Sequence, residues 1–207
     1  MFLLNPFVFS QSGSQSIWLD MPFSTTTWLN DQSGNNRQLT QKSGGLTVTT
    51  TNDANGALRF NGSGFLVTQD SKPLLDKDFN ISCEVFIEAV SDFYSVFLAQ
   101  RVTSATKDIE FYSLSDGRLY VVIYFSDNSG ETFTGVAVRN QWQSIEMSRI
   151  GNVFTLKVDG VIAETKTINK TVRSDSNGKF NIGSANEIDA SGTPTGSMRN
   201  LRVQVSD

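Results

Sequence analysis

The sequence contains no histidine, one cysteine and four prolines in 207 residues. Without histidine, the chain lacks the side chain that most often serves as a general base near neutral pH and as a metal ligand. The single thiol, Cys83, excludes a disulfide within the chain, and its alternating apolar surroundings predict a buried structural cysteine. Cysteine usage therefore fits either a reducing compartment or a cysteine-poor protein in an oxidising one.

Long apolar runs and runs of one charge are missing as well. No apolar segment approaches the roughly 20 residues that an α-helix needs to span a bilayer, so no membrane span is expected. The 17 basic and 21 acidic residues give a net charge of −4 and form no basic stripe, which argues against nucleic acid as a partner. Residues 1–10 lack the basic start and the small-residue cleavage site of a secretory signal.

Residues 1–15 are expected to form an N-terminal arm and linker, and residues 16–207 are expected to form one domain. Six apolar side chains precede a polar stretch of Ser, Gln and Gly. Burial of these side chains in a partner subunit would supply several kcal/mol, which favours a docking role. A disordered terminus or an additional edge strand is the competing interpretation. The six residues are Phe2, Leu3, Leu4, Phe7, Val8 and Phe9.

The sequence does contain many strand-length apolar segments separated by turn signals. In residues 79–89 apolar side chains alternate with mostly polar ones, which places one row on a core and the other outside. Asp159-Gly160 between two such segments is typical of a tight hairpin turn. No segment longer than about ten residues has helical period, so an all-β antiparallel β-sandwich is predicted. Further strands are expected at 17–23, 57–68, 94–100, 108–114, 118–125, 132–138, 143–150, 152–158, 161–168, 179–182 and 197–205.

Four groups of segments follow one another in a recognisable order. They are LDMPF at 19–23 with DQSGNN at 31–36, ALRFNG at 57–62 with DFNISCEV at 78–85, NQWQSIEMSR at 140–149 with FTLKVDG at 154–160, and FNIG at 180–183 with TGSMRNLRV at 195–203. Across residues 17–205 this order resembles the laminin-G-like branch of the concanavalin A-like jelly rolls. The resemblance implies a jelly-roll sandwich with Trp142 in its core, but it does not name a ligand, because this scaffold carries many unrelated functions. The sequence departs from the family pattern at Val85 and Gln143, where the family has tryptophan and histidine.

A hydrolytic site finds little support in the sequence. The related glucanases place three carboxylates at i, i+2 and i+5 of one strand, and this chain has no such triplet. The nearest pair, Glu84 and Glu88, would stand ~13 Å apart along a strand, beyond the ~5–9.5 Å that glycoside hydrolysis uses. A serine or cysteine nucleophile would have no histidine as its base. We therefore predict no catalytic residues.

Ligand-binding residues are sought among aromatic side chains and polar loops. Trp18 and Trp28 are candidate platforms for a sugar ring, with packing as the competing interpretation. Asp127, Asn128 and Asp189 are candidate ligand-binding residues from polar loops.

The laminin-G-like resemblance makes calcium the one candidate cofactor. Calcium takes oxygen ligands gathered from loops. Asp31, Asn35, Glu187 and Asp189 are weak candidates, and ordinary polar turn residues are the competing explanation.

The leading hypothesis is a non-catalytic bacteriophage virion surface protein, either a tail adhesin or fibre or a capsid decoration protein. It would be made in the host cytoplasm, join other virion proteins through its N-terminal arm, and attach to a host-surface glycan or a protein. A homo-oligomer is compatible with this hypothesis. The alternatives are a carbohydrate-binding module of a secreted protein and a glycoside hydrolase that degrades polysaccharide.

Overall fold

The structure is a computed structural model of the chain, and it describes residues 15–23, 30–42, 46–50, 56–69, 76–89, 94–103, 106–174, 178–185 and 192–206. The predicted arm, with Phe2, Leu3, Leu4, Phe7, Val8 and Phe9, lies outside these residues, so its docking role stays a prediction. Throughout the described ranges the chain forms strands and turns, with no helix that is long and apolar enough to cross a membrane.

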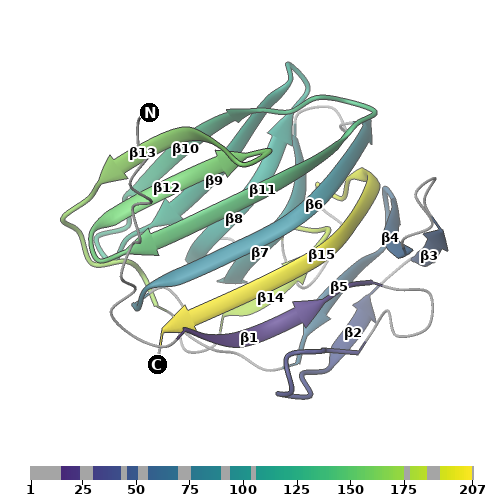
Figure 1. Cartoon of the computed structure of the whole chain (residues 1–207), viewed down its shortest axis with the longest axis horizontal. Helices are drawn as coiled ribbons and strands as arrows, with labels where there is room; N and C mark the ends of the chain where they lie inside the picture. The colour runs from purple at the N-terminus through teal and green to yellow at the C-terminus, as the bar shows by residue number, and fades with distance from the viewer. Residues whose placement is uncertain are drawn as a thin grey trace, which may run out of the picture.

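Two antiparallel sheets face each other (Figure 1). The eight-stranded sheet has the order β13 (Val161–Thr167), β12 (Val153–Val158), β11 (Trp142–Ile150), β6 (Phe79–Ala89), β15 (Thr195–Ser206), β4 (Gly56–Asn61) and β3 (Thr47–Thr50), with β1 (Gln15–Met21) also paired to β15. The seven-stranded sheet has the order β10 (Gly130–Val136), β9 (Arg118–Tyr124), β8 (Thr106–Leu114), β7 (Tyr94–Thr103), β14 (Lys179–Ile182), β5 (Phe65–Thr68) and β2 (Leu39–Lys42). The predicted all-β antiparallel sandwich is confirmed.

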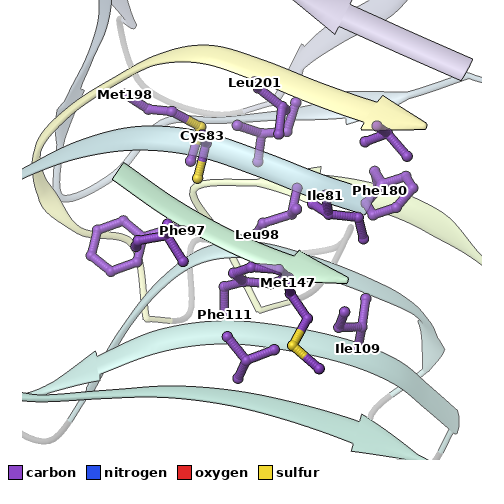
Figure 2. Packing of buried hydrophobic residues seen from close by; sticks show 14 of the residues in the cluster. Ile81, Cys83, Phe97, Leu98, Ile109, Phe111, Met147, Phe180, Met198 and Leu201 are labelled. Atoms are coloured by element: carbon purple, nitrogen blue, oxygen red, sulfur yellow. The ribbon is translucent and has the colours of Figure 1, made fainter. Parts of the chain in front are cut away.

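The core lies between the two sheets and is built from the inward row of each strand. On β6, Phe79, Ile81, Cys83, Val85 and Ile87 are buried, while the residues between them are only partly covered, as the alternation predicts. Figure 2 shows the thiol among apolar side chains of both sheets. Burial raises the pKa of Cys83 to about 12, so the thiol stays protonated and unreactive.

Two parts of the strand pattern differ from the sequence expectation. The predicted strand region 57–68 divides at residues 62–64 into β4 and β5, which belong to different sheets. A turn makes this change of sheet, with Asn61 Oδ1 accepting the N–H groups of Ser63 (3.1 Å) and Gly64 (3.2 Å). β2 and β3 form between residues 23 and 57, where no strand was predicted.

Candidate functional site

Trp18 lies inside the sandwich, with 2% of its surface exposed. Its ring centroid is 5.4 Å from that of Phe180, and the Arg37 guanidinium covers the ring at 4.1 Å. An enclosed ring offers no face to a sugar, so we correct the platform prediction for Trp18, which is a packing residue. Trp28, the other predicted platform, lies outside the described residues.

Asp31 braces the loop that follows β1. Its Oδ1 accepts the N–H groups of Asp20 (3.0 Å) and Ser33 (2.9 Å), and its Oδ2 accepts the N–H of Arg37 (3.0 Å). Burial alone would raise the pKa of Asp31, but the hydrogen bond from the Ser33 hydroxyl and these backbone hydrogen bonds bring it below the usual value. The Asn35 side-chain amide donates to the Ile17 carbonyl at 2.7 Å and so ties the same loop to β1.

These contacts account for the DQSGNN motif as a structural loop. The remaining calcium candidates, Glu187 and Asp189, lie outside the described residues. Within the part of the chain that the structure describes, no group of three or more His, Cys, Asp or Glu side chains is placed to hold a metal ion.

Asp127 and Asn128 occupy the turn between β9 and β10. The Ser129 N–H donates to Asp127 Oδ1 (2.9 Å), and Lys170 Nζ lies 3.3 Å from Asp127 Oδ2. The Ser129 hydrogen bonds, helped by Lys170, lower the pKa of Asp127 to about 2. Asn128 Oδ1 accepts a hydrogen bond from Arg173. Both predicted residues therefore hold the turn against residues 170–173. Asp189, another candidate ligand-binding residue, is not among the described residues.

Trp142 lies on the outer face of the eight-stranded sheet, and not in the core that the resemblance implied. It stands opposite Phe86 of β6, with 5.6 Å between the ring centroids, and the Arg199 guanidinium lies 4.2 Å from its ring centroid. The inward position of β11 is taken instead by Gln143, whose Oε1 accepts the Val138 N–H at 2.6 Å. Because side chains alternate along a strand, Trp142 points outward.

Glu84 and Glu88, the nearest carboxylate pair of one strand, are each held by an arginine. Arg199 Nη2 lies 2.7 Å from Glu84 Oε2, and the Arg59 guanidinium forms a bidentate ion pair with the Glu88 carboxylate. The hydrogen bonds from Arg59 lower the pKa of Glu88. A general acid for glycoside hydrolysis needs a raised pKa, so Glu88 does not have the environment that this chemistry requires.

The outer face of the seven-stranded sheet carries a row of three tyrosines, Tyr94 on β7, Tyr112 on β8 and Tyr120 on β9. The ring centroids are 6.0 Å apart from Tyr94 to Tyr112 and 5.5 Å apart from Tyr112 to Tyr120. Tyr94 is 38% exposed, and the other two rings are partly exposed. The Arg118 guanidinium lies 5.4 Å from the Tyr120 ring and closes one end of this tyrosine row.

Register and alternation bring the three tyrosines together. Tyr112 is directly opposite Tyr120, because Phe111 faces Val121 on the core side. Tyr94 is placed by a close approach of backbone at Gly192. The Gly192 carbonyl accepts the Val96 N–H at 2.7 Å, and a Cβ at Gly192 would lie 2.9 Å from the Tyr94 ring.

A buried ionic cluster lies beside the tyrosine row. Glu110, 5% exposed, is 3.3 Å from Arg101 Nη1 and 3.2 Å from Lys107 Nζ, and it accepts the Tyr124 hydroxyl proton at 2.9 Å. Burial first, and then the Glu110 charge, raises the pKa of Tyr124, so its hydroxyl remains a donor. The cluster links β7, β8 and β9 and so stabilises the sheet face that carries the tyrosine row.

Sequence reasoning missed the tyrosine row, although a signal was available. Ile109 and Phe111 face the core on β8, which places Tyr112 outside. On β9, Leu119 and Val121 face the core, which places Tyr120 on the outer face.

A family model described as the concanavalin A-like lectin/glucanases superfamily matches residues 60–205. Among curated protein sequences, none matches the chain.

Several solved structures share this fold at low sequence identity. Domain 4 of AbnA, a GH43 extracellular arabinanase from Geobacillus stearothermophilus solved in complex with arabinotriose, is 14% identical with a TM-score of 0.71, and the match covers 93% of each chain. The binding domain of botulinum neurotoxin serotype D is 12% identical with a TM-score of 0.69, covering 93% of this chain and 49% of the toxin chain. The binding domain of Paraclostridial Mosquitocidal Protein 1 is 14% identical with a TM-score of 0.72, covering 92% and 49%. The chain thus spans about half the length of the two toxin domains.

Proposed function

Because the chain belongs to the concanavalin A-like lectin/glucanases superfamily, we propose that it is a non-catalytic module that binds a glycan through the tyrosine row. The observation that carries this proposal is the succession of three partly exposed phenol rings across neighbouring strands, with planes tilted by 71° and 57° from one ring to the next. Aromatic rings present an apolar face on which the C–H face of a sugar packs, and tyrosine adds a hydroxyl that hydrogen-bonds to the sugar.

The geometry of the tyrosine row favours a chain of sugars over a single sugar. The row crosses three strands, and neighbouring strands lie ~4.8 Å apart, so successive rings can contact successive sugar units. Arg118 forms an ion pair with Asp116, and its guanidinium provides a hydrogen-bond donor at one end of the row. The rigid sheet positions the rings before the ligand arrives, which reduces the entropy that binding costs.

Two further observations support binding over catalysis. The arabinanase domain with the same fold is described as a complex with arabinotriose, and the two toxin domains are described as binding domains. On this chain, Glu84 and Glu88 are neutralised by arginines, and Glu110 is enclosed by two cations.

A binding assay on a glycan array, with calcium present and absent, tests the proposal. We expect the wild-type protein to bind a subset of oligosaccharides and Tyr94→Ala/Tyr120→Ala to lose those signals. Val161→Ala, which truncates an exposed apolar side chain on β13, is the matched control and should bind like the wild type. If no glycan bound, or if the double variant bound as well as the control, the proposal would be wrong.

We further propose that the module works on a bacteriophage virion surface, joined to other virion proteins through residues 1–15. The support is the sequence itself, with an apolar arm followed by a polar linker, and a single cysteine. An extracellular protein, as the arabinanase is described, is the alternative setting. Mass spectrometry of purified particles should find the full-length protein and should miss a variant that lacks residues 1–15. Equal incorporation of the two forms would exclude the docking role.

A further inference from the structure

A hollow of about 210 Å³ lies on the outer face of the eight-stranded sheet, on the side of the sandwich away from the tyrosine row. It lies over β6, β11, β12 and β15, which run side by side in Figure 1. We propose that this hollow is a second carbohydrate site, which holds one neutral sugar residue. Its polar lining comes from Ser82, Glu84, Ser144, Glu146, Lys157 and Asn200.

Two β-bulges shape the hollow. On β15 the register passes from Arg199 opposite Glu84 to Arg202 opposite Ser82, so residues 200 and 201 stand against one residue of β6. Asn200 takes a φ of 53°, which is uncommon for a residue with a side chain. A second bulge interrupts the pairing of β12 with β13 at Lys157. Bulges inside a sheet redirect side chains and are frequent next to functional sites.

The bulge on β15 directs a hydrogen-bond donor, the side-chain amide of Asn200, onto the outer face of the eight-stranded sheet. Asn200 is exposed, and its Nδ2 donates to Glu84 Oε1 at 2.6 Å. Arg199 Nε donates to Glu84 Oε2 at 2.8 Å, so both carboxylate oxygens are fixed in place. Lys157 Nζ holds Glu146 in the same way at 2.9 Å.

The carboxylates that line the hollow are paired, which bears on the class of ligand. Glu84 is paired with Arg199 and Glu146 with Lys157, so neither lining carboxylate is left without a cation, and the neighbouring Asp159 carboxylate accepts the Ser144 N–H. A charged ligand would leave one charge uncompensated on a partly buried surface. Carboxylate oxygens, hydroxyls, an ammonium and an amide together accept and donate hydrogen bonds, as the hydroxyls of a neutral sugar require.

An aromatic pair lies on the same sheet face as the hollow, one same-face register pair away along β6 and β11. Trp142 and Phe86 form the register pair next to Ser144 and Glu84, and Arg199 stacks on the Trp142 ring. These rings lie outside the lining of the hollow, so the recognition that we propose there rests on hydrogen bonds to the hydroxyls of the sugar. The volume of the hollow is below the roughly 300–1,000 Å³ of pockets for drug-sized ligands, so one sugar residue is the size it suits.

The test is an amide NMR titration of Tyr120→Ala, which weakens the tyrosine row and leaves the hollow intact. The probes are arabinotriose, xylotriose, cellotriose and maltotriose. We expect at least one of them to shift the amide signals of Ser82, Ser144 and Asn200 in a saturable way. Ser144→Tyr, added to fill the hollow, should weaken this binding at least about tenfold. Thr165→Tyr, on the exposed edge strand β13, is the matched control and should leave it unchanged.

A second variant distinguishes loss of the site from misfolding of the Ser144→Tyr protein. Asn200→Gly removes the amide donor while glycine keeps the positive φ without strain, so it should fold and bind several-fold more weakly. The inference is overturned if no neutral trisaccharide shifts these amides, or if both hollow variants bind as Thr165→Tyr does. Shifts at the amides of residues 94 and 112 report the tyrosine row separately, so the two sites can fail independently.

Discussion

Asp31 is the residue on which the loop after β1 depends most. Its carboxylate accepts three backbone N–H groups and the Ser33 hydroxyl. We expect Asp31→Ala to lower the free energy of unfolding by about 2–3 kcal/mol, because three partly buried donors lose a charged acceptor. Val161→Ala, at an exposed position of β13, is the control and should change it by less than about 0.5 kcal/mol. Urea unfolding measures both, and equal losses would contradict the bracing role.

The Asp127 carboxyl provides a prediction of pH dependence. Its pKa of about 2 lies below the usual value of 3.8. Because the folded-state pKa is lowered, the stabilisation is present above about pH 4 and is lost as the pH falls toward 2. A carbon NMR titration should place the midpoint near 2, and Ser129→Ala should move it toward 3.8. A wild-type midpoint near 3.8 would mean that the Ser129 contacts do not hold in solution.

Single residues also show where sequence reasoning failed. We expected Trp18 to be a candidate platform and Trp142 to be in the core, and the structure reverses these positions. For Trp142 the alternation of Ile145 and Met147 already indicated an outward position, and the family resemblance obscured it. For Trp18 no local pattern indicates burial, because Phe180 and Arg37 come from distant segments.

At the scale of elements, β10 and β13 end the two sheets on the same side of the sandwich. Glu164 of β13 accepts the Thr134 N–H at 2.7 Å, and Lys166 donates to the Thr132 carbonyl at 2.6 Å. Side chains of one edge strand thus occupy backbone groups that the other would offer to another chain.

Removal of these two side chains should therefore expose the β10 edge. We expect Glu164→Ala/Lys166→Ala to form larger species at concentrations where the wild type does not change, because unpaired strand edges recruit further strands. Thr165→Ala, which lies between them on the exposed side, is the matched control. Light scattering after size exclusion measures the difference, and identical elution of all three proteins would refute edge protection.

The elements with a clear period could be predicted from the sequence, and the edge strands could not. The alternation of residues 79–89 and the Asp159-Gly160 turn correspond to β6 and to the β12–β13 hairpin. β2 and β3 are four residues each and are rich in Thr, Gln and Lys. Such short polar segments become strands because a neighbouring strand pairs with them, and their own composition does not indicate this pairing.

For the whole molecule, the candidate sites lie on the faces of the sheets. The tyrosine row combines residues separated by loops and strands, and its formation depends on the register between β7, β8 and β9. The hollow depends in the same way on the pairing of β6 with β11 and β15. Sequence alternation identifies which residues point outward, but only the strand order places them together.

The central claim is that the tyrosine row binds a chain of sugars, and calorimetric titration with oligosaccharides of increasing length tests it most directly. We expect affinity to rise from one unit to three units and then to level off, because the row offers three rings. Tyr120→Ala should weaken the longest ligand about 3- to 10-fold and abolish the final increase with length. If affinity does not depend on length, or if Tyr120→Ala binds as the wild type does, the tyrosine row is not the glycan site.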